Sequence, residues 1–172
     1  LKLLQHACKI KANRLLVLQM DAPRKLLRLA CDALGAEALG IMGQLNAKTL
    51  EYTRTREQFG VPIGSFQALQ HRMVDTFMSY EQARSLLYRA VCALEKADED
   101  PARDIHALKV MIDKAGKHIY GEAIQLHGGM GITDELDIGH YAKRLMMINA
   151  IFGNGDYHQG RFNALSYGRN AA

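Results

Sequence analysis

The fold is decided by the stretch Arg54-Thr55-Arg56-Glu57-Gln58-Phe59-Gly60-Val61-Pro62-Ile63-Gly64-Ser65-Phe66-Gln67. Two arginines close a long segment rich in alanine and leucine, and two glycines and a proline follow between positions 60 and 64. Glycine and proline so close together are typical of a tight turn. Ser65 stands after the turn, where a serine can cap the first turn of a helix. The stretch therefore predicts two long helices, from Lys25 to about Glu57 and from Ser65 to about Lys96.

Further helices are predicted on both sides of this pair. Apolar residues recur at helical spacing over residues 2–20. Asp100-Pro101 places a capping side chain before a proline, which predicts a helix from about Pro101 to His127. Shorter helices are predicted from Thr133 to about Ile151, and from the break at residues 153–156 to about Tyr167. We find no strand-like alternation and no internal repeat, so the expected fold class is all-α, an antiparallel helix bundle.

The 3.6-residue period predicts which side chains of the longest helices face the core. In the helix after the turn they are Phe66, Leu69, Met73, Phe77, Tyr80 and Ala83. In the helix after Pro101 they are Ile105, Leu108, Met111, Ile112, Ala115, Ile119 and Ala123.

Composition narrows the class of protein. The chain has 172 residues, 48% of them hydrophobic, with three prolines and no tryptophan, which suits one helical domain with its own core. The net charge of +4 suits an anionic cofactor or CoA, and no basic stripe with interleaved aromatic residues indicates nucleic acid. Three cysteines and seven histidines show no metal-ligand spacing. We therefore expect no metal site and reduced thiols in an intracellular protein.

The start of the chain allows two interpretations. The first 20 residues carry basic residues and no acidic one, as a transit peptide does. We prefer the interpretation that the sequence is a piece of a longer protein, because it begins at Leu1. No apolar run in the sequence is long enough to span a bilayer, since charged residues interrupt each one.

A second informative stretch is Gln125-Leu126-His127-Gly128-Gly129-Met130-Gly131-Ile132-Thr133. Its three glycines within four residues exceed what one helix C-cap needs, and they let a ligand approach the backbone closely. In the first stretch, Arg54 and Arg56 allow two interpretations. Basic residues stabilise a helix C-terminus through its dipole, whereas guanidinium groups also bind phosphate oxygens through forked, charge-assisted hydrogen bonds.

Together the two stretches resemble the C-terminal helical domain of acyl-CoA dehydrogenases, flavoenzymes that desaturate acyl-CoA thioesters at the α and β carbons. The resemblance runs from about Ala30 to about Arg161. It implies that residues 24–172 form this domain and that residues 1–23 are an N-terminal helical segment outside it. It also implies FAD as the cofactor and an acyl-CoA as the substrate.

The resemblance implies which residues contact an FAD that is held mainly by the neighbouring subunit. They are Arg56, Gln58, Phe59, Gln125, Gly128 and Gly129. The arginine matches a residue that contacts the FAD pyrophosphate, and the next two match positions that pack on the same cofactor. The last three match positions that contact its adenosine-diphosphate half. His127, between them, is interpreted as a local structural residue.

The catalytic glutamate of the family has no counterpart at its usual positions. In the family it abstracts the α-proton while a hydride moves to flavin N5, and its two usual positions match Gly153 and Ala30. General-base catalysis needs a carboxylate within hydrogen-bond reach of the proton. Asp156 is the candidate for a relocated base, and its alternative role is to cap the last helix.

Residues 140–158 resemble a subgroup, the small-subunit type of pimeloyl-CoA dehydrogenase and related two-subunit bacterial enzymes. We therefore expect an acyl-CoA dehydrogenase of fatty acid metabolism that oxidises acyl-CoA to enoyl-CoA in the bacterial cytoplasm, with this fragment alone inactive. Expected partners are further copies in a dimer or tetramer, or an unlike subunit, and electron-transfer flavoprotein as an electron acceptor. Two alternatives stay open: a non-catalytic assembly subunit that completes a partner's FAD site, and a helical oligomerisation module without flavin.

Overall fold

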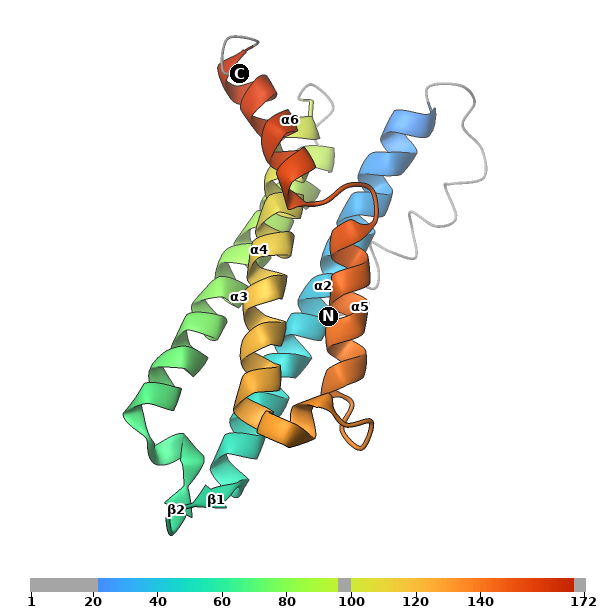
Figure 1. Ribbon diagram of the computed structural model, residues 1–172. Coiled ribbons are helices and arrows are strands. Elements are labelled where there is room, and N and C mark those ends of the chain that lie inside the picture. The colour runs from blue at the N-terminus through green and yellow to red at the C-terminus, as the bar shows by residue number, and fades with distance from the viewer. Residues whose placement is uncertain (1–21, 96–99, 169–172) are drawn as a thin grey trace.

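The computed structural model describes residues 22–95 and 100–168, which form an elongated bundle of five α-helices (Figure 1). The helices are α2 (Ala22–Thr55), α3 (Gln67–Glu95), α4 (Ala102–His127), α5 (Ile138–Ala150) and α6 (Gly155–Tyr167). The helices α2, α3, α4 and α5 alternate in direction along the bundle, so the expected all-α antiparallel fold is confirmed. The helix predicted over residues 2–20 lies outside the described residues.

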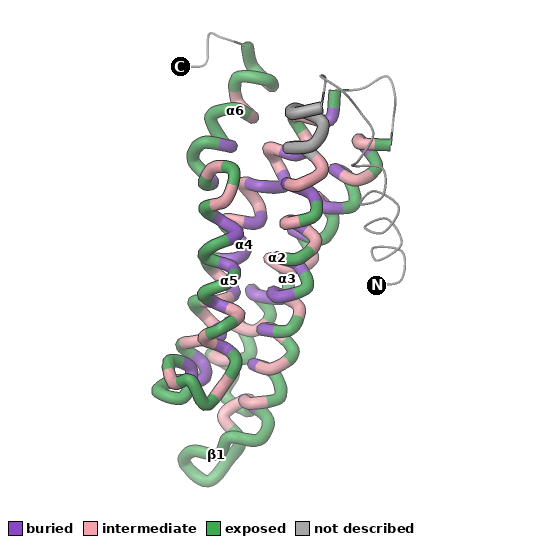
Figure 2. The backbone as a smooth tube through the Cα atoms, turned by 90° about the vertical axis from the view of Figure 1, so that its right-hand side faces the viewer, coloured by how far each residue is buried: buried purple, intermediate pink, exposed green. Residues whose placement is uncertain are grey.

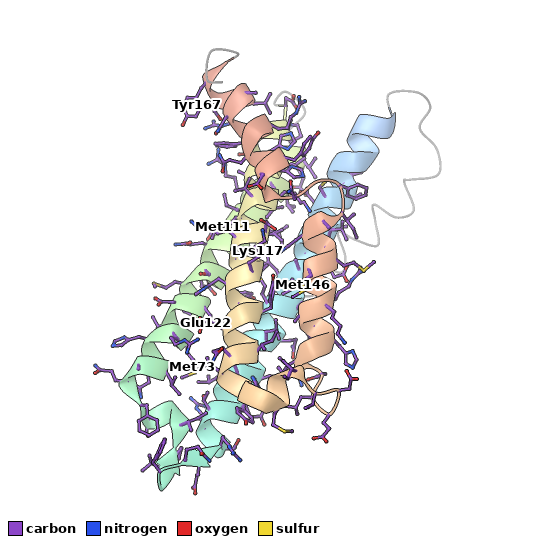
Figure 3. The ribbon with its side chains drawn as sticks, viewed as in Figure 1. Met73, Met111, Lys117, Glu122, Met146 and Tyr167 are labelled. Atoms are coloured by element: carbon purple, nitrogen blue, oxygen red, sulfur yellow. The ribbon has the colours of Figure 1, made fainter. Side chains whose placement is uncertain are left out.

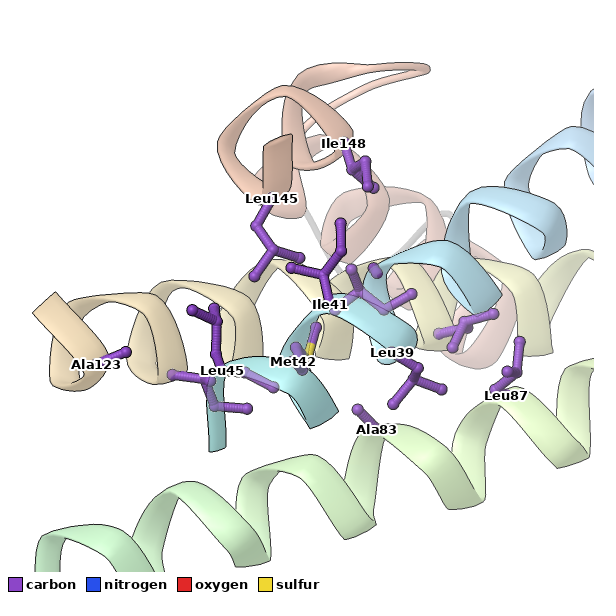
Figure 4. Packing of buried hydrophobic residues seen from close by; sticks show 14 of the residues in the cluster. Leu39, Ile41, Met42, Leu45, Ala83, Leu87, Ala123, Leu145 and Ile148 are labelled. Carbon is purple, nitrogen blue, oxygen red and sulfur yellow. The ribbon is translucent and has the colours of Figure 1, made fainter. Parts of the chain in front are cut away.

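Helix α4 is the centre of the bundle, because it packs against all four of the other α-helices. Six of the seven apolar side chains predicted for its inner face are buried, and Met111 is half-buried. Figure 4 shows side chains of α2, α3, α4 and α5, among them Met42, Leu45, Ala83 and Leu145, converging on one core. Burying a large apolar side chain of this kind contributes roughly 1.5–3 kcal/mol to the free energy of folding.

The apolar face predicted for α3 is only partly correct. Ala83 is buried and Met73 and Tyr80 are half-buried, but Phe77 keeps 57% of its surface exposed. The helix lies at the edge of the bundle and touches only α2, α4 and η1 with more than a few residues (Figure 1). Its buried stripe is narrower than its apolar stripe, which the sequence period alone does not reveal.

A short β-hairpin joins α2 to α3, where the sequence predicted only a turn. Strands β1 (Glu57–Gln58) and β2 (Val61–Pro62) pair antiparallel, and a 3-10 turn, η1 (Ile63–Ser65), follows. The two residues between the strands, Phe59 and Gly60, both have positive φ, at 57° and 79°. Two residues of positive φ match the twist of a tight hairpin, which explains why so short a connection reverses the chain.

Besides α2, which begins at Ala22 rather than at Lys25, three predicted helix starts differ from the structure. The Ser65 hydroxyl donates to the Pro62 carbonyl oxygen within η1, and α3 begins at Gln67. The Thr133 hydroxyl likewise donates to the Met130 carbonyl oxygen, and α5 begins only at Ile138. In both places the hydroxyl hydrogen-bonds to the turn that precedes it rather than starting a helix. The third difference concerns α6, which begins at Gly155 rather than after residue 156.

Burial follows the bundle axis. Figure 2 shows buried residues along the inner sides of the helices and exposed residues at the hairpin. Helix α2 is buried along its middle, where Ala38, Met42 and Leu45 are fully enclosed. None of the helices over residues 22–95 and 100–168 is both long enough and apolar enough to cross a membrane.

Candidate functional site

Two polar segments from distant parts of the sequence lie at the same end of the bundle. We call residues 54–63 the arginine turn and residues 125–132 the glycine loop. The arginine turn ends α2, and the glycine loop comprises the last turn of α4 and the 3-10 turn η2 (Gly128–Ile132). Both lie at the end of the bundle that carries the hairpin (Figure 1). The structure thus brings together the segments whose residues the sequence nominated.

The backbone of Arg56 is fixed from both sides. Its N–H donates to the Tyr52 carbonyl oxygen over 2.8 Å, and its own carbonyl oxygen accepts from the Ile63 N–H over 2.8 Å. The side chain is exposed and, like that of Arg54, forms no ion pair with any residue in the described ranges. Both guanidinium groups therefore keep their hydrogen-bond donors available for an external anion.

The other nominated residues of the arginine turn face solvent. The Gln58 side-chain amide donates to the Glu57 carbonyl oxygen over 2.6 Å. The ring of Phe59 is 93% exposed and touches only the edge of Phe66, with 6.2 Å between ring centroids. A phenylalanine with positive φ and an almost bare ring is uncommon. Such a side chain is typical of a surface that another molecule covers.

The glycine loop presents open backbone. Gly128 has φ of 60°, and its N–H donates to the Gln125 carbonyl oxygen, which ends α4. A side chain added at Gly128 or at Gly129 would meet nothing within 4 Å, so both glycines border open space. The side chain of Ile132, at the end of the loop, is 76% exposed. The loop therefore combines approachable backbone with a bare apolar side chain, as the arginine turn combines guanidinium groups with Phe59.

The two segments are joined by Tyr52 and His127. The tyrosine ring stacks on the imidazole with 4.4 Å between centroids, and its hydroxyl donates to the His127 carbonyl oxygen over 3.4 Å. The His127 ring is buried, and its Nδ1–H donates to the Ala123 carbonyl oxygen over 2.7 Å. Burial lowers the pKa of His127, so the ring is neutral at neutral pH. This agrees with the interpretation of His127 as a structural residue.

These residues fit one end of a dinucleotide cofactor. A diphosphate needs forked cationic donors, which Arg54 and Arg56 offer, and backbone that it can approach closely, which Gly128 and Gly129 offer. The exposed apolar rings and side chains at this end would cover flat or apolar parts of a ligand or a second chain. Nothing in the described residues occupies the space in front of the two glycines.

The two positions that match the family's glutamate lie away from this end. Ala30 is in α2 and half-buried, and Gly153 is in the loop between α5 and α6. Lys109 of α4 interacts both with Cys31, the neighbour of Ala30, and with the backbone that precedes Gly153. Its ammonium group donates to the carbonyl oxygens of Ile148 and Ile151, each over 2.9 Å, and it opposes the rise that burial causes in the pKa of Cys31.

The backbone at Gly153 does not suit a glutamate in this arrangement. Its φ of 108° is one that residues with a side chain rarely adopt, and an added Cβ would lie 2.5 Å from Cδ1 of Tyr157. The preceding residue, Phe152, also has a positive φ, at 63°. The position is therefore shaped for glycine, with the Tyr157 ring beside it.

Two histidines hold the loop before α6. His158 is buried, and its Nε2 lies 3.1 Å from the Phe152 carbonyl oxygen, which can only accept, so Nε2 carries the proton. Its Nδ1 therefore accepts from Nδ1–H of His106, 2.7 Å away on α4. Burial, and next the neighbouring His106, lower the pKa of His158 to about 4.

Asp156 does not cap α6. The cap is Asn154, whose Oδ1 accepts from the Tyr157 N–H over 3.0 Å, so the capping role considered for Asp156 is wrong. Asp156 lies exposed in the first turn of α6, where the helix dipole favours a carboxylate. Asp113 and, more weakly, Asp156 raise the pKa of Lys117, which Figure 3 labels on α4.

Sequence reasoning missed Tyr52, Lys109 and the His106–His158 pair. Tyr52 precedes Arg56 by one helical turn, and that spacing was the available signal for a shared role. Lys109 lies among apolar residues on the inner face of α4, where a charged side chain breaks the pattern. The pairing of His106 with His158 spans 52 positions and left no local signal. Among the described residues no group of three side chains is placed to bind a metal ion.

Comparisons with known proteins agree with this arrangement. Residues 24–162 match the family described as acyl-CoA dehydrogenase, C-terminal domain. Acyl-CoA dehydrogenase IpdE2 of Mycobacterium tuberculosis is 39% identical over 115 residues, which are 67% of this chain and 34% of the relative. The chain spans about a third of the length of curated relatives that it matches.

Solved structures share the fold. The ChsE4-ChsE5 complex from Mycobacterium tuberculosis contains a chain that superposes with a TM-score of 0.80 at 26% identity, covering 86% of this chain and 40% of that one. PigA with FAD and proline superposes with a TM-score of 0.74 at 30% identity, covering 80% of this chain and 36% of that one. The first of these is a complex of two differently named proteins, and the second contains FAD.

The buried His158 makes the stability of the fold depend on pH. Its pKa is lowered from 6.5 to about 4, so its contribution is complete above pH 6.5 and is lost as the pH falls toward 4. We expect the free energy of unfolding to decrease by up to about 3 kcal/mol over this range. Urea unfolding at a series of pH values measures it.

Histidine variants separate this contribution from other titrating groups. The groups that face His158 are His106 and Lys109 of α4 and the Phe152 carbonyl. His158→Gln should flatten the decrease between pH 6.5 and 4, whereas His140→Gln, at an exposed position of α5, should leave it intact. An equal pH dependence in His158→Gln and the unaltered protein would contradict the assignment.

Proposed function

This chain belongs to the acyl-CoA dehydrogenase family, whose C-terminal domain it contains, and we propose that this domain completes the FAD site of a neighbouring subunit in an enzyme that oxidises acyl-CoA to enoyl-CoA. One observation carries the proposal. The arginine turn and the glycine loop, far apart in the sequence, lie together at one end of the bundle with their donors available.

Each segment has a distinct role in the proposed site. The Arg56 guanidinium binds the FAD diphosphate, and Gln58 and Phe59 pack on the same cofactor. Gln125 and the two glycines that follow α4 contact its adenosine-diphosphate half. When bound, FAD supplies the acceptor for the hydride, while the residues of this chain bind and orient its other end.

The exposed apolar side chains at this end support a contact with a neighbouring subunit. Phe59, at 93% exposure, is one of the proposed cofactor contacts, and Ile132, at 76% exposure, ends the segment that carries the others. Leaving two large apolar side chains bare in solvent gains no hydrophobic stabilisation, whereas covering them on assembly does. The neighbouring subunit would be a further copy in a dimer or tetramer.

A second candidate is that an unlike chain supplies the catalytic base. Gly153 has the backbone of a glycine-only position and Tyr157 beside it, so no glutamate fits there in this arrangement. Ala30 also lacks a carboxylate. This favours a two-chain acyl-CoA dehydrogenase in which this chain contributes structure and FAD contacts. Residues 140–158 of this chain resemble the small-subunit type of pimeloyl-CoA dehydrogenase, which belongs to such a two-chain enzyme.

The remaining parts of the proposal follow from the family. We propose that the domain extends over residues 24–172, that residues 1–23 precede it, and that the enzyme works in the cytoplasm. Electron-transfer flavoprotein is the proposed electron acceptor. The isolated bundle is expected to be inactive, because the rest of the FAD site lies in other parts of the enzyme.

Arg56→Ala tests the diphosphate contact. In the complete protein, losing a charge-assisted hydrogen bond to phosphate costs roughly 1.5–3 kcal/mol, so the affinity for FAD should fall about tenfold or more. Helix content should stay the same, because the side chain is exposed and forms no ion pair with the described residues. Flavin fluorescence during titration with FAD measures the affinity.

Arg84→Ala is the matched control for Arg56→Ala. Arg84 is an exposed arginine of α3 whose ion pair with Glu81 is local, so its loss should leave FAD affinity unchanged. Equal FAD affinities for Arg56→Ala and Arg84→Ala would mean that Arg56 only stabilises the end of α2 through the helix dipole.

Asp156→Asn distinguishes a relocated base from a base in another chain. The amide keeps the shape of the side chain but cannot accept a proton, so a base at Asp156 predicts loss of flavin reduction by acyl-CoA with substrate binding retained. The exposed place of Asp156 in the first turn of α6 favours the opposite result. Asp134→Asn, at another exposed aspartate, is the control. Flavin reduction that survives Asp156→Asn unchanged would dismiss the relocated base and favour a base in another chain.

A further inference from the structure

We propose that Tyr52 is a positioning residue, one that holds the arginine turn and the glycine loop in the single arrangement that an FAD molecule can bridge. The inference rests on the proposed function and deepens it, because it concerns the same site. Tyr52 itself need not touch the cofactor. It would act through Arg56 on one side and through the glycine loop on the other.

The side chain of Tyr52 reaches across from α2 to the end of α4. Its ring stacks on His127 at 4.4 Å between centroids with 28° between the ring planes, and its hydroxyl donates to the carbonyl oxygen of the same residue. His127 is the last residue of α4 and the residue before the first glycine of the loop. A contact to both the ring and the carbonyl group of His127 therefore fixes where the glycine loop begins.

The backbone of Tyr52 fixes the other segment. Its carbonyl oxygen accepts from the Arg56 N–H over 2.8 Å, the last helical hydrogen bond before the hairpin. Tyr52 thus contacts both segments: its backbone hydrogen-bonds to Arg56, and its side chain contacts His127. A shift of the tyrosine ring would move the end of α2 relative to the end of α4.

The stacked rings of Tyr52 and His127 lie between the buried core and the exposed parts of the two segments. Every residue from Arg54 to Pro62 is exposed, and so is every residue from Gly128 to Met130. These outer parts of the two segments gain no position from core packing, whereas Leu126, His127 and Gly131 of the glycine loop are buried. Tyr52 and His127 lie at the inner border of both segments, so they form the direct link between them.

The histidine side of the stack is held from within. The imidazole is only 4% exposed, and its Nδ1–H donates to the Ala123 carbonyl oxygen one turn earlier in α4. Gly131 packs against it, because a side chain at that position would lie 3.1 Å from the His127 Cβ. The ring therefore gives Tyr52 a fixed surface, and the loop folds back over the same residue.

A double-mutant cycle in the complete protein with its neighbouring subunit tests the coupling. The variants are Tyr52→Leu, Arg56→Ala and the two combined, with FAD as the titrated ligand. Because Tyr52 acts through Arg56 and through the glycine loop, Tyr52→Leu alone should weaken FAD binding about tenfold and should add clearly less than that when Arg56→Ala is already present. Tyr52→Phe, which keeps the stacked ring, should restore most of the affinity.

Hydrogen exchange of the FAD-free protein provides a second measurement. Tyr52→Leu should speed the exchange of backbone amides in both the arginine turn and the glycine loop, while the core of α4 keeps its protection. Tyr88→Leu, at an exposed tyrosine of α3, is the matched control and should change neither segment. This measurement needs no cofactor and stays informative if a variant binds FAD too weakly to titrate.

The outcomes separate the inference from the proposed function. Arg56→Ala without effect on FAD binding would remove the proposed diphosphate contact and the inference with it. Arg56→Ala with the expected loss, combined with fully additive effects of Tyr52→Leu, would overturn the inference alone. Faster exchange in only one of the two segments would overturn the inference as well, because losing a residue that holds both segments should speed exchange in both.

Discussion

Helix α4 packs against each of the other α-helices in residues 22–95 and 100–168, and the rest of this described structure depends on that packing. Both functional regions lie at the ends of this one helix. Its C-terminus leads into the glycine loop, and residues near its N-terminus, Lys109 and His106, hold the loop around Gly153. Because α4 is buried along its length, neither end can move without disturbing the core. In the proposed function, the bundle separates the end that contacts the cofactor from the region that matches the family's glutamate.

The two regions differ in how they are built. The arginine turn and the glycine loop face outward and keep their donors available, which is suited to a ligand or subunit that arrives from outside. The loop around Gly153 is held by buried groups, with Lys109 on the Ile151 carbonyl and His158 on the Phe152 carbonyl. At Gly153, the position that we propose to match the family's glutamate, any side chain would require both a rare φ and a shift of the Tyr157 ring.

The helices could be predicted from the sequence because their signals are local. The period of apolar residues identified the inner face of α4, and glycine and proline marked the turn after α2. The hairpin was missed because two-residue strands leave no alternation to read. The helix starts at Ser65 and Thr133 were wrong because each hydroxyl hydrogen-bonds backward, a choice that depends on turn geometry.

The resemblance nominated the residues of the candidate site, and the structure shows how they are connected. Arg56 and the glycines drew attention because guanidinium groups and open backbone suit phosphate, and the family resemblance then gave them a proposed role. The link through Tyr52 and His127 spans 75 positions and joins two ordinary residues, so only the folded chain reveals it. The structure also shows that Asn154, and not Asp156, caps α6, because this helix begins at Gly155.

The most direct test of the central claim is a structure of the complete FAD-loaded protein with its neighbouring subunit. The account predicts that the diphosphate of an FAD held by the neighbouring subunit lies within hydrogen-bond distance, about 3 Å, of the Arg56 guanidinium, with its adenosine half beside Gly128 and Gly129. An FAD bound elsewhere, with the arginine turn and the glycine loop left uncovered, would contradict the account.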